Sequence, residues 1–185
     1  MTRFLQACLA SALVFGIAIG DEPAKTEPTV KVGAKAPEFK FKDQSGKTIN
    51  LADLFAKGPV LVRLTCGCSG CDKELAYFQE IDAAYKKAGL TSVAIFREAD
   101  EKVAKYALEK KINMLYGVDT KGASWGVFQT KTMPTNILIG KGGEIIHIAP
   151  GCDTTGFLAK KVSEKIAKTL ATDAVDVQKK VTEKK

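Results

Sequence analysis

The sequence predicts an α/β fold built on a central mixed sheet with helices on both faces. Short β-branched runs alternate with segments whose apolar residues recur at helical spacing. Strands separated by helices pair in parallel, and a hairpin near the C-terminal end adds an antiparallel edge. With 185 residues, 45% of them hydrophobic, the chain suits one domain with one core.

Strands are expected where apolar residues alternate, or where β-branched residues form a short run bounded by turn residues. The first two form an N-terminal hairpin, and the last two form a hairpin around the glycine-rich turn at 140–143. The expected strands are residues 40–42, 46–50, 59–65, 91–96, 135–139 and 144–148.

Helices are expected where apolar side chains recur every three or four residues. Asp100 can cap one helix, and Thr154 or Thr155 can cap the last. Trp125 lies on a short helix at 122–128 and is expected in the core. The longer helices are residues 74–87, a segment carrying Val103, Tyr106, Ala107 and Leu108, and a segment carrying Leu158, Val162, Ile166 and Leu170.

The N-terminus has the layout of a secretory signal peptide. A short basic start that ends at Arg3 precedes an apolar run over 4–19, and small residues lead to a cleavage site after Gly20. Removal of residues 1–20 predicts a periplasmic or secreted protein with no membrane span, and it takes Cys8 away. An uncleaved N-terminal anchor is the alternative, although the apolar run is short for a spanning helix.

The rest of the chain divides into a linker at 21–32, a domain at 33–171 and a charged tail at 172–185. The formal net charge is +7, but the lysines are spread along helices without interleaved aromatics, so we expect no nucleic-acid partner. One histidine in the whole chain excludes a histidine-rich metal site.

Three cysteines within six residues carry the predicted chemistry. Cys68 and Cys71 form a C-x-x-C at the junction of a buried strand and a helix. Cys68 would lie at the helix N-terminus, where free N–H groups and the helix dipole favour a reactive thiolate. Cys71, one turn further, could close a disulfide and expel a partner. A static disulfide, or half of a zinc site completed by Cys66, Cys152 or His147, is the alternative.

These residues resemble the redoxin group of thioredoxin-fold proteins, particularly the exported TlpA-like thiol–disulfide oxidoreductases. The resemblance runs from about residue 32 to about residue 170, and the order and spacing of its pieces make it specific. Besides the C-x-x-C, the matching segments are residues 33–39, 46–54, 59–62, 133–139 and 141–146.

The resemblance implies that Pro134 is a cis-proline that lies against the C-x-x-C, and that the Met133 backbone binds an extended substrate segment. The chain departs from the family at Gly67, where tryptophan is usual, and at Val62, where a buried acid is usual. Proton transfer to Cys71 would then use water or another acid such as Glu74.

Cys66 is a third departure from the family. On an extended strand it would point to the same side as Cys68, as a competing resolving thiol or as part of a Cu(I)-binding cluster. A small buried side chain is an equally good interpretation.

Two further residues are expected at the edge of the sheet that carries Cys68. The final hairpin returns to this edge, so Cys152 should border the site as an auxiliary thiol, or else remain a free, half-buried cysteine. Arg97 ends a neighbouring strand, where its charge would favour a thiolate. A solvent-facing arginine is the more common arrangement.

The sequence therefore predicts an exported, monomeric thiol–disulfide oxidoreductase that needs no cofactor or metal. Cys68 attacks and Cys71 resolves, with protein thiols or disulfides and an electron donor or acceptor as partners. One alternative is a peroxiredoxin-like peroxidase, since residues 65–68 give a T-x-x-C; however, Leu61 stands where that motif has proline, and no arginine follows Arg97. The other is a Cu(I) or zinc carrier that uses the three clustered cysteines.

Overall fold

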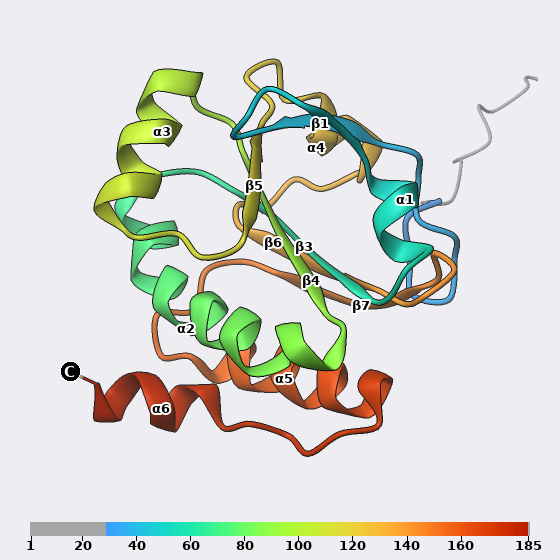
Figure 1. Ribbon diagram of the computed structural model, residues 1–185, viewed down its shortest axis with the longest axis vertical. Coiled ribbons are helices and arrows are strands. Elements are labelled where there is room, and N and C mark those ends of the chain that lie inside the picture. The colour runs from blue at the N-terminus through green and yellow to red at the C-terminus, as the bar shows by residue number, and fades with distance from the viewer. Residues whose placement is uncertain (1–28, 185) are drawn as a thin grey trace, which may run out of the picture.

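The computed structural model describes residues 29–184 (Figure 1). A single mixed sheet has the strand order β2-β1-β5-β4-β3-β6-β7. The parallel pairs are β3 with β4 and β4 with β5, and the remaining neighbours are antiparallel. The strands are β1 (Lys40–Asp43), β2 (Thr48–Asn50), β3 (Val60–Thr65), β4 (Thr91–Phe96), β5 (Leu115–Val118), β6 (Thr135–Ile139) and β7 (Ile145–Pro150).

Helices cover both faces of this sheet, which confirms the predicted α/β class with its N-terminal hairpin (Figure 1). The helices α2, α5 and α6 lie together below the sheet in that view, and α1 and α4 lie on the other side. The helices are α1 (Leu51–Phe55), α2 (Ser69–Tyr85), α3 (Asp100–Glu109), α4 (Ala123–Val127), α5 (Phe157–Leu170) and α6 (Val177–Glu183).

Alternation along β3 divides the interior into two apolar clusters, one on each face of the sheet. Val60, Val62 and Leu64 face the cluster beneath α1 and α4. Leu61 faces the cluster beneath α2 and α5, and Arg63 points to that same face. The sheet is therefore buried on both sides, as the continuous apolar run in β3 predicts.

Strand β5 is absent from the sequence prediction. It has four residues, most of them half-buried, and Gly117 interrupts its apolar pattern. This glycine is required by a close approach, because a Cβ there would come within 2.2 Å of the Phe41 ring. A glycine in a short strand removes the signal that periodicity relies on.

Two predicted helix caps are wrong. Helix α3 begins at Asp100 itself, and its N-cap is Ala99. Helix α5 has Gly156 as N-cap with φ of 84°. The Asp153 carboxylate accepts the Leu158 N–H at 2.7 Å, and the Thr155 hydroxyl, one residue before the N-cap, accepts the Phe157 N–H at 3.4 Å. The carboxylate is favourable there because it faces the positive end of the helix dipole.

The segment 172–184, expected as part of a charged tail or a frayed helix end, contains α6 (Val177–Glu183). Val177 and Val181 are buried against the cluster beneath α2 and α5. Tyr85 of α2 fixes the connection, because its hydroxyl accepts the Val175 N–H at 2.8 Å. The sequence does not predict this helix because its apolar pattern consists of only two valines, four residues apart, among lysines and other polar residues. Among residues 29–184, no helix is long and apolar enough to cross a membrane.

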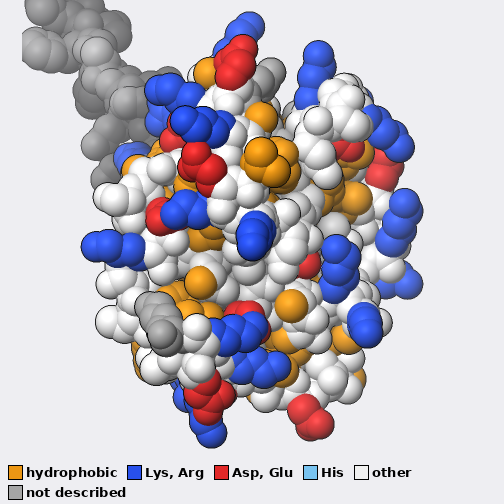
Figure 2. All heavy atoms as spheres, turned by 60° about the vertical axis from the view of Figure 1, so that its left-hand side comes forward, with side chains coloured by type: hydrophobic (Ala, Val, Ile, Leu, Met, Phe, Trp, Pro, Cys, Tyr) orange, Lys and Arg blue, Asp and Glu red, His pale blue; other side chains and the backbone are white. Residues whose placement is uncertain are grey.

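The molecular face that carries α3 mixes basic and acidic side chains, with apolar groups visible between them (Figure 2). The basic residues on this face are spread out. They do not gather into one patch.

Candidate active site

The cysteine cluster lies where β3 ends and α2 begins. β3 stops at Thr65, and α2 starts at Ser69 with Cys68 as its N-cap. The Cys68 carbonyl accepts the Asp72 N–H at 2.9 Å, so the helix starts at this cysteine. The Cys68 side chain is exposed. Its sulfur is thus open to a partner at the positive end of a helix of 17 residues.

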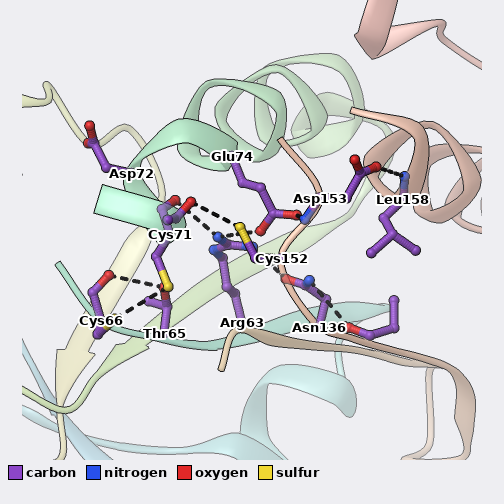
Figure 3. A network of polar contacts seen from close by, with 12 residues as sticks. Arg63, Thr65, Cys66, Cys71, Asp72, Glu74, Asn136, Cys152, Asp153 and Leu158 are labelled. Atoms are coloured by element: carbon purple, nitrogen blue, oxygen red, sulfur yellow. Dashed lines mark hydrogen bonds and ion pairs between the residues drawn. The ribbon is translucent and has the colours of Figure 1, made fainter. Parts of the chain in front are cut away.

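Three sulfurs converge at this junction. The Sγ atoms of Cys66, Cys68 and Cys71 all lie within 4.8 Å of one another. The Sγ atoms of Cys66 and Cys71 are 3.3 Å apart (Figure 3). Their side chains are buried, whereas Cys68 is exposed. A partner molecule can therefore reach the Cys68 sulfur, whereas the Cys66 and Cys71 sulfurs are shielded from solvent.

The environment separates the acidities of the clustered thiols. The pKa of Cys68 is lowered, first because the Cys66 thiol donates a hydrogen bond to its sulfur and then through the Cys71 backbone N–H. The pKa of Cys66 is strongly raised, mainly because burial disfavours its thiolate. Cys68 is thus the thiol of this pair that ionises first.

A buried polar network supports Cys71 from below (Figure 3). Arg63 Nη2 lies 3.0 Å from Glu74 Oε2 and also donates to the Cys71 carbonyl at 3.3 Å. Its Nη1 donates to Asn136 Oδ1 at 3.0 Å. The other Glu74 oxygen accepts the Asp153 N–H at 2.6 Å. One arginine thus links β3, α2 and β6 directly under the cysteines.

Arg63 and Asn136 are not among the site residues that the sequence predicts. Arg63 was visible as the single charge inside the apolar run of β3, and such a charge is rarely buried without a partner. Both Glu74 oxygens accept hydrogen bonds, one from the Arg63 guanidinium and the other from the Asp153 N–H. Glu74 is thus the partner of a buried cation.

Pro134 stands beside the end of β3. The register pairs Leu64 with Thr135, which sets Pro134 level with Thr65, next to the cysteine loop. The Met133–Pro134 peptide is cis, as the resemblance implied. Pro134 is buried and Met133 is half-buried. The Pro134 carbonyl accepts the Gly151 N–H at 2.8 Å, which joins this segment to the turn before Cys152.

The structure brings Cys152 to the cluster and directs Arg97 elsewhere. Cys152 Sγ donates to the Gly70 carbonyl at 3.2 Å, within the first turn of α2 (Figure 3). Its pKa is raised, mainly by burial. The Arg97 guanidinium lies 5.9 Å from the centre of the Trp125 ring and packs against Gly122.

A groove of about 430 Å³ opens beside Cys68. Glu98 forms part of its wall, and one of its carboxylate oxygens accepts the Gly67 N–H at 2.8 Å. This bond holds the middle of the cysteine loop. The lining also includes Phe96, Val103 and Tyr106, so an apolar side chain of a partner would find contacts next to the exposed sulfur.

A family model described as the AhpC/TSA family matches residues 32–148 of the sequence. The chain belongs to this family. The thiol-disulfide oxidoreductase ResA of Bacillus cereus is 30% identical over 138 residues, which cover 71% of this chain and 79% of that protein. Because this similarity extends over most of both chains, the protein is a thiol-disulfide oxidoreductase of the ResA type.

Solved structures share the fold of this chain. A protein described as a thiol:disulfide interchange protein DsbE from Chlorobium tepidum superposes with a TM-score of 0.70 at 22% identity, over 76% of this chain and 99% of that one. The peroxidoxin BcpB of Mycobacterium tuberculosis gives 0.64 at 22% identity, over 77% and 97%. Both likenesses show the thioredoxin-like fold.

Proposed function

We propose that the protein exchanges disulfides with protein partners through Cys68 and Cys71. The observation that carries this proposal is an exposed thiol of lowered pKa at a helix N-terminus, with the buried Cys71 sulfur within 4.8 Å. A thiolate is the attacking species in disulfide exchange, and buried thiols are protected from unwanted reaction.

The exchange has two steps. In the first, the Cys68 thiolate attacks one sulfur of a partner disulfide, forms a mixed disulfide and releases the other partner sulfur as a thiolate. In the second, Cys71 loses its proton to solvent and attacks Cys68 Sγ. This forms the Cys68–Cys71 disulfide and releases the second partner thiolate, so the partner is reduced by two electrons and the enzyme is oxidised by two. The reverse sequence oxidises a dithiol.

The partner segment would lie along Met133 and Pro134. The register sets Pro134 level with Thr65, where the cysteine loop begins, and an extended partner segment bound there would reach Cys68. The groove on the other side of Cys68 offers apolar contacts to a neighbouring side chain. This arrangement favours an unfolded or flexible peptide segment as substrate.

A trapping experiment tests the proposal. We compare Cys71→Ser/Cys152→Ser, which keeps Cys68 together with the Cys66 thiol that lowers its pKa, with the matched control Cys68→Ser/Cys71→Ser, which keeps Cys66 and the exposed Cys152. After incubation with insulin, the variant that keeps Cys68 should form a covalent complex that dithiothreitol dissolves, at a rate at least tenfold above the control. Equal or absent trapping would contradict the role of Cys68.

We further propose that the protein acts outside the cytoplasm. Residues 1–20, which carry the predicted signal peptide, lie outside the described residues, and this proposal rests on their sequence alone. N-terminal sequencing of the protein isolated from the producing cell should find a chain that starts at Asp21. A chain that starts at Met1 would indicate an uncleaved anchor.

A second candidate function is the binding of a soft metal ion. Three thiols within 4.8 Å of one another form a ligand set suited to Cu(I) or zinc. The burial that raises the pKa of Cys66 opposes loss of its proton, so redox exchange is the better-supported function. Anaerobic titration with Cu(I) in competition with a chromophoric chelator distinguishes them: stoichiometric, tight binding without insulin reduction would favour the carrier.

The peroxidase alternative has less support. The likeness to peroxidoxin extends to the fold alone, and Arg97 packs against Trp125. Rapid formation of a sulfenic acid at Cys68 with hydrogen peroxide, followed by stopped-flow fluorescence, would favour this alternative.

A further inference from the structure

The contact between Cys66 and Cys71 indicates a third redox-active thiol in the exchange reaction. We propose that Cys66 is a second resolving cysteine, which converts the Cys68–Cys71 disulfide into a buried Cys66–Cys71 disulfide and sets Cys68 free again. This inference rests on the proposed function, because it needs the Cys68–Cys71 disulfide as its starting point.

The positions of the sulfurs favour this step. Cys66 and Cys71 Sγ are already 3.3 Å apart, so closing a bond of about 2.05 Å needs a movement of little more than 1 Å. The loop that carries Cys66 is held at its midpoint by the bond from the Gly67 N–H to Glu98. The Cys71 sulfur can therefore form a disulfide either with the exposed Cys68 or with the buried Cys66.

The step is an isomerisation that needs no outside oxidant. Cys66 gives up its proton to solvent and attacks Cys71 Sγ. It is a thiolate only during this attack, whereas a metal ligand would have to remain one. The Cys66–Cys71 bond forms, the Cys68–Cys71 bond breaks, and Cys68 leaves as a thiolate. The active site contains one disulfide before and after the step.

The leaving group sets the direction of this isomerisation. Thiol–disulfide exchange is faster when the departing thiol has the lower pKa, and Cys68 is the thiol whose thiolate the site stabilises. A Cys68–Cys71 disulfide forfeits that stabilisation altogether. A Cys66–Cys71 disulfide gives up the hydrogen bond from the Cys66 thiol, but it leaves the Cys68 thiolate facing the Cys71 backbone N–H at the N-terminus of α2. Together with the 3.3 Å approach of the two buried sulfurs, this favours the Cys66–Cys71 disulfide, called the inner disulfide below, as the oxidised form.

Burial gives the inner disulfide a distinct property. Cys66 is 8% exposed and Cys71 is 3% exposed, so an external thiol cannot reach their bond directly. Reduction has to pass through attack by Cys68, which is exposed. The oxidised protein would therefore keep one reactive thiol and hold its disulfide away from small reductants.

Disulfide mapping tests the inference on the purified protein. After oxidation with one equivalent of diamide, the protein is unfolded in guanidinium chloride at low pH and its free thiols are blocked with N-ethylmaleimide. The disulfide is then reduced and labelled with iodoacetamide. Cleavage after Arg63 and Lys73 puts all three cysteines in one peptide, residues 64–73, which is sequenced by mass spectrometry. We expect N-ethylmaleimide on Cys68 at least ten times as often as on Cys66, with iodoacetamide labels on Cys66 and Cys71.

The outcomes separate this inference from the proposed function. N-ethylmaleimide mainly on Cys66, with Cys68 and Cys71 labelled second, would overturn the inner disulfide and leave the exchange reaction intact. N-ethylmaleimide on all three would show that no disulfide forms, and both proposals would fall. In oxidised Cys66→Ala, Cys68 should lose its reactivity to N-ethylmaleimide at least tenfold. The matched variant Cys152→Ser removes the neighbouring thiol and should give the wild-type map.

Discussion

Arg63 and Glu74 form an ion pair of 3.0 Å with both side chains buried, directly beneath Cys71. The pair joins the central strand to the helix that carries the second active cysteine. Removing one partner of a buried pair leaves an unpaired charge in a medium that solvates it poorly. The active site thus depends on a charge pair that periodicity alone does not reveal.

Arg63→Met should destabilise the protein by about 3–5 kcal/mol, because Glu74 would remain buried without its cation. The double variant Arg63→Met/Glu74→Leu should cost less than the sum of the two single variants. Urea unfolding measures these values. The control Lys161→Ala breaks an exposed pair with Glu164 and should cost no more than about 0.5 kcal/mol. A loss of similar size in Arg63→Met would refute the structural role of the pair.

The acidity of Cys68 should depend on Cys66. The hydrogen bond from Cys66 is the largest cause of the lowered pKa of Cys68, so Cys66→Ala should raise that pKa toward an ordinary thiol value. The rate of alkylation by iodoacetamide follows the thiolate fraction, and its pH profile should therefore move to higher pH in the variant. An unchanged profile would assign the low pKa to the backbone groups of α2 alone.

Cys152 should be able to reach Cys68 when Cys71 is absent. Its sulfur lies 3.2 Å from the Gly70 carbonyl, in the turn between the two active cysteines. Mild oxidation of Cys66→Ala/Cys71→Ser should give a Cys68–Cys152 disulfide that mass spectrometry detects. If only intermolecular disulfides form, Cys152 has no auxiliary redox role.

Helix α6 should contribute to the stability of the domain. Val181 is 4% exposed in the cluster beneath α2, and Val181→Ala should cost about 2 kcal/mol of unfolding free energy through lost apolar burial. Thermal unfolding measures the change. Lys179→Ala on the exposed side of the same helix is the matched control, and an equal effect of the two variants would show that α6 is not packed as described.

Sequence patterns identified those elements whose physical signal is local. The run in β3, the helical spacing in α2 and α5, and the C-x-x-C at a strand–helix junction all follow from neighbouring residues. Topology then placed Cys152 near the cysteine loop, because the last hairpin had to return to the same edge of the sheet.

Other features depend on contacts between distant segments. Gly117 belongs to a strand because Phe41 packs over it, and the partners of Arg63 come from three separate elements. Asp153 caps α5 because the chain turns at Gly156, where a threonine cap was predicted. The 3.3 Å approach of Cys66 to Cys71 is likewise tertiary, since β3 ends at Thr65 and the argument from an extended strand does not reach Cys66.

Insulin reduction in the presence of dithiothreitol tests the central claim most directly, with wild type, Cys68→Ser and Cys68→Ser/Cys71→Ser compared at equal concentration. Replacing the attacking sulfur should lower turnover about 10³-fold or more, and the double variant should be no worse than the single one because the two cysteines act as a unit. Wild-type turnover in the double variant would contradict the account.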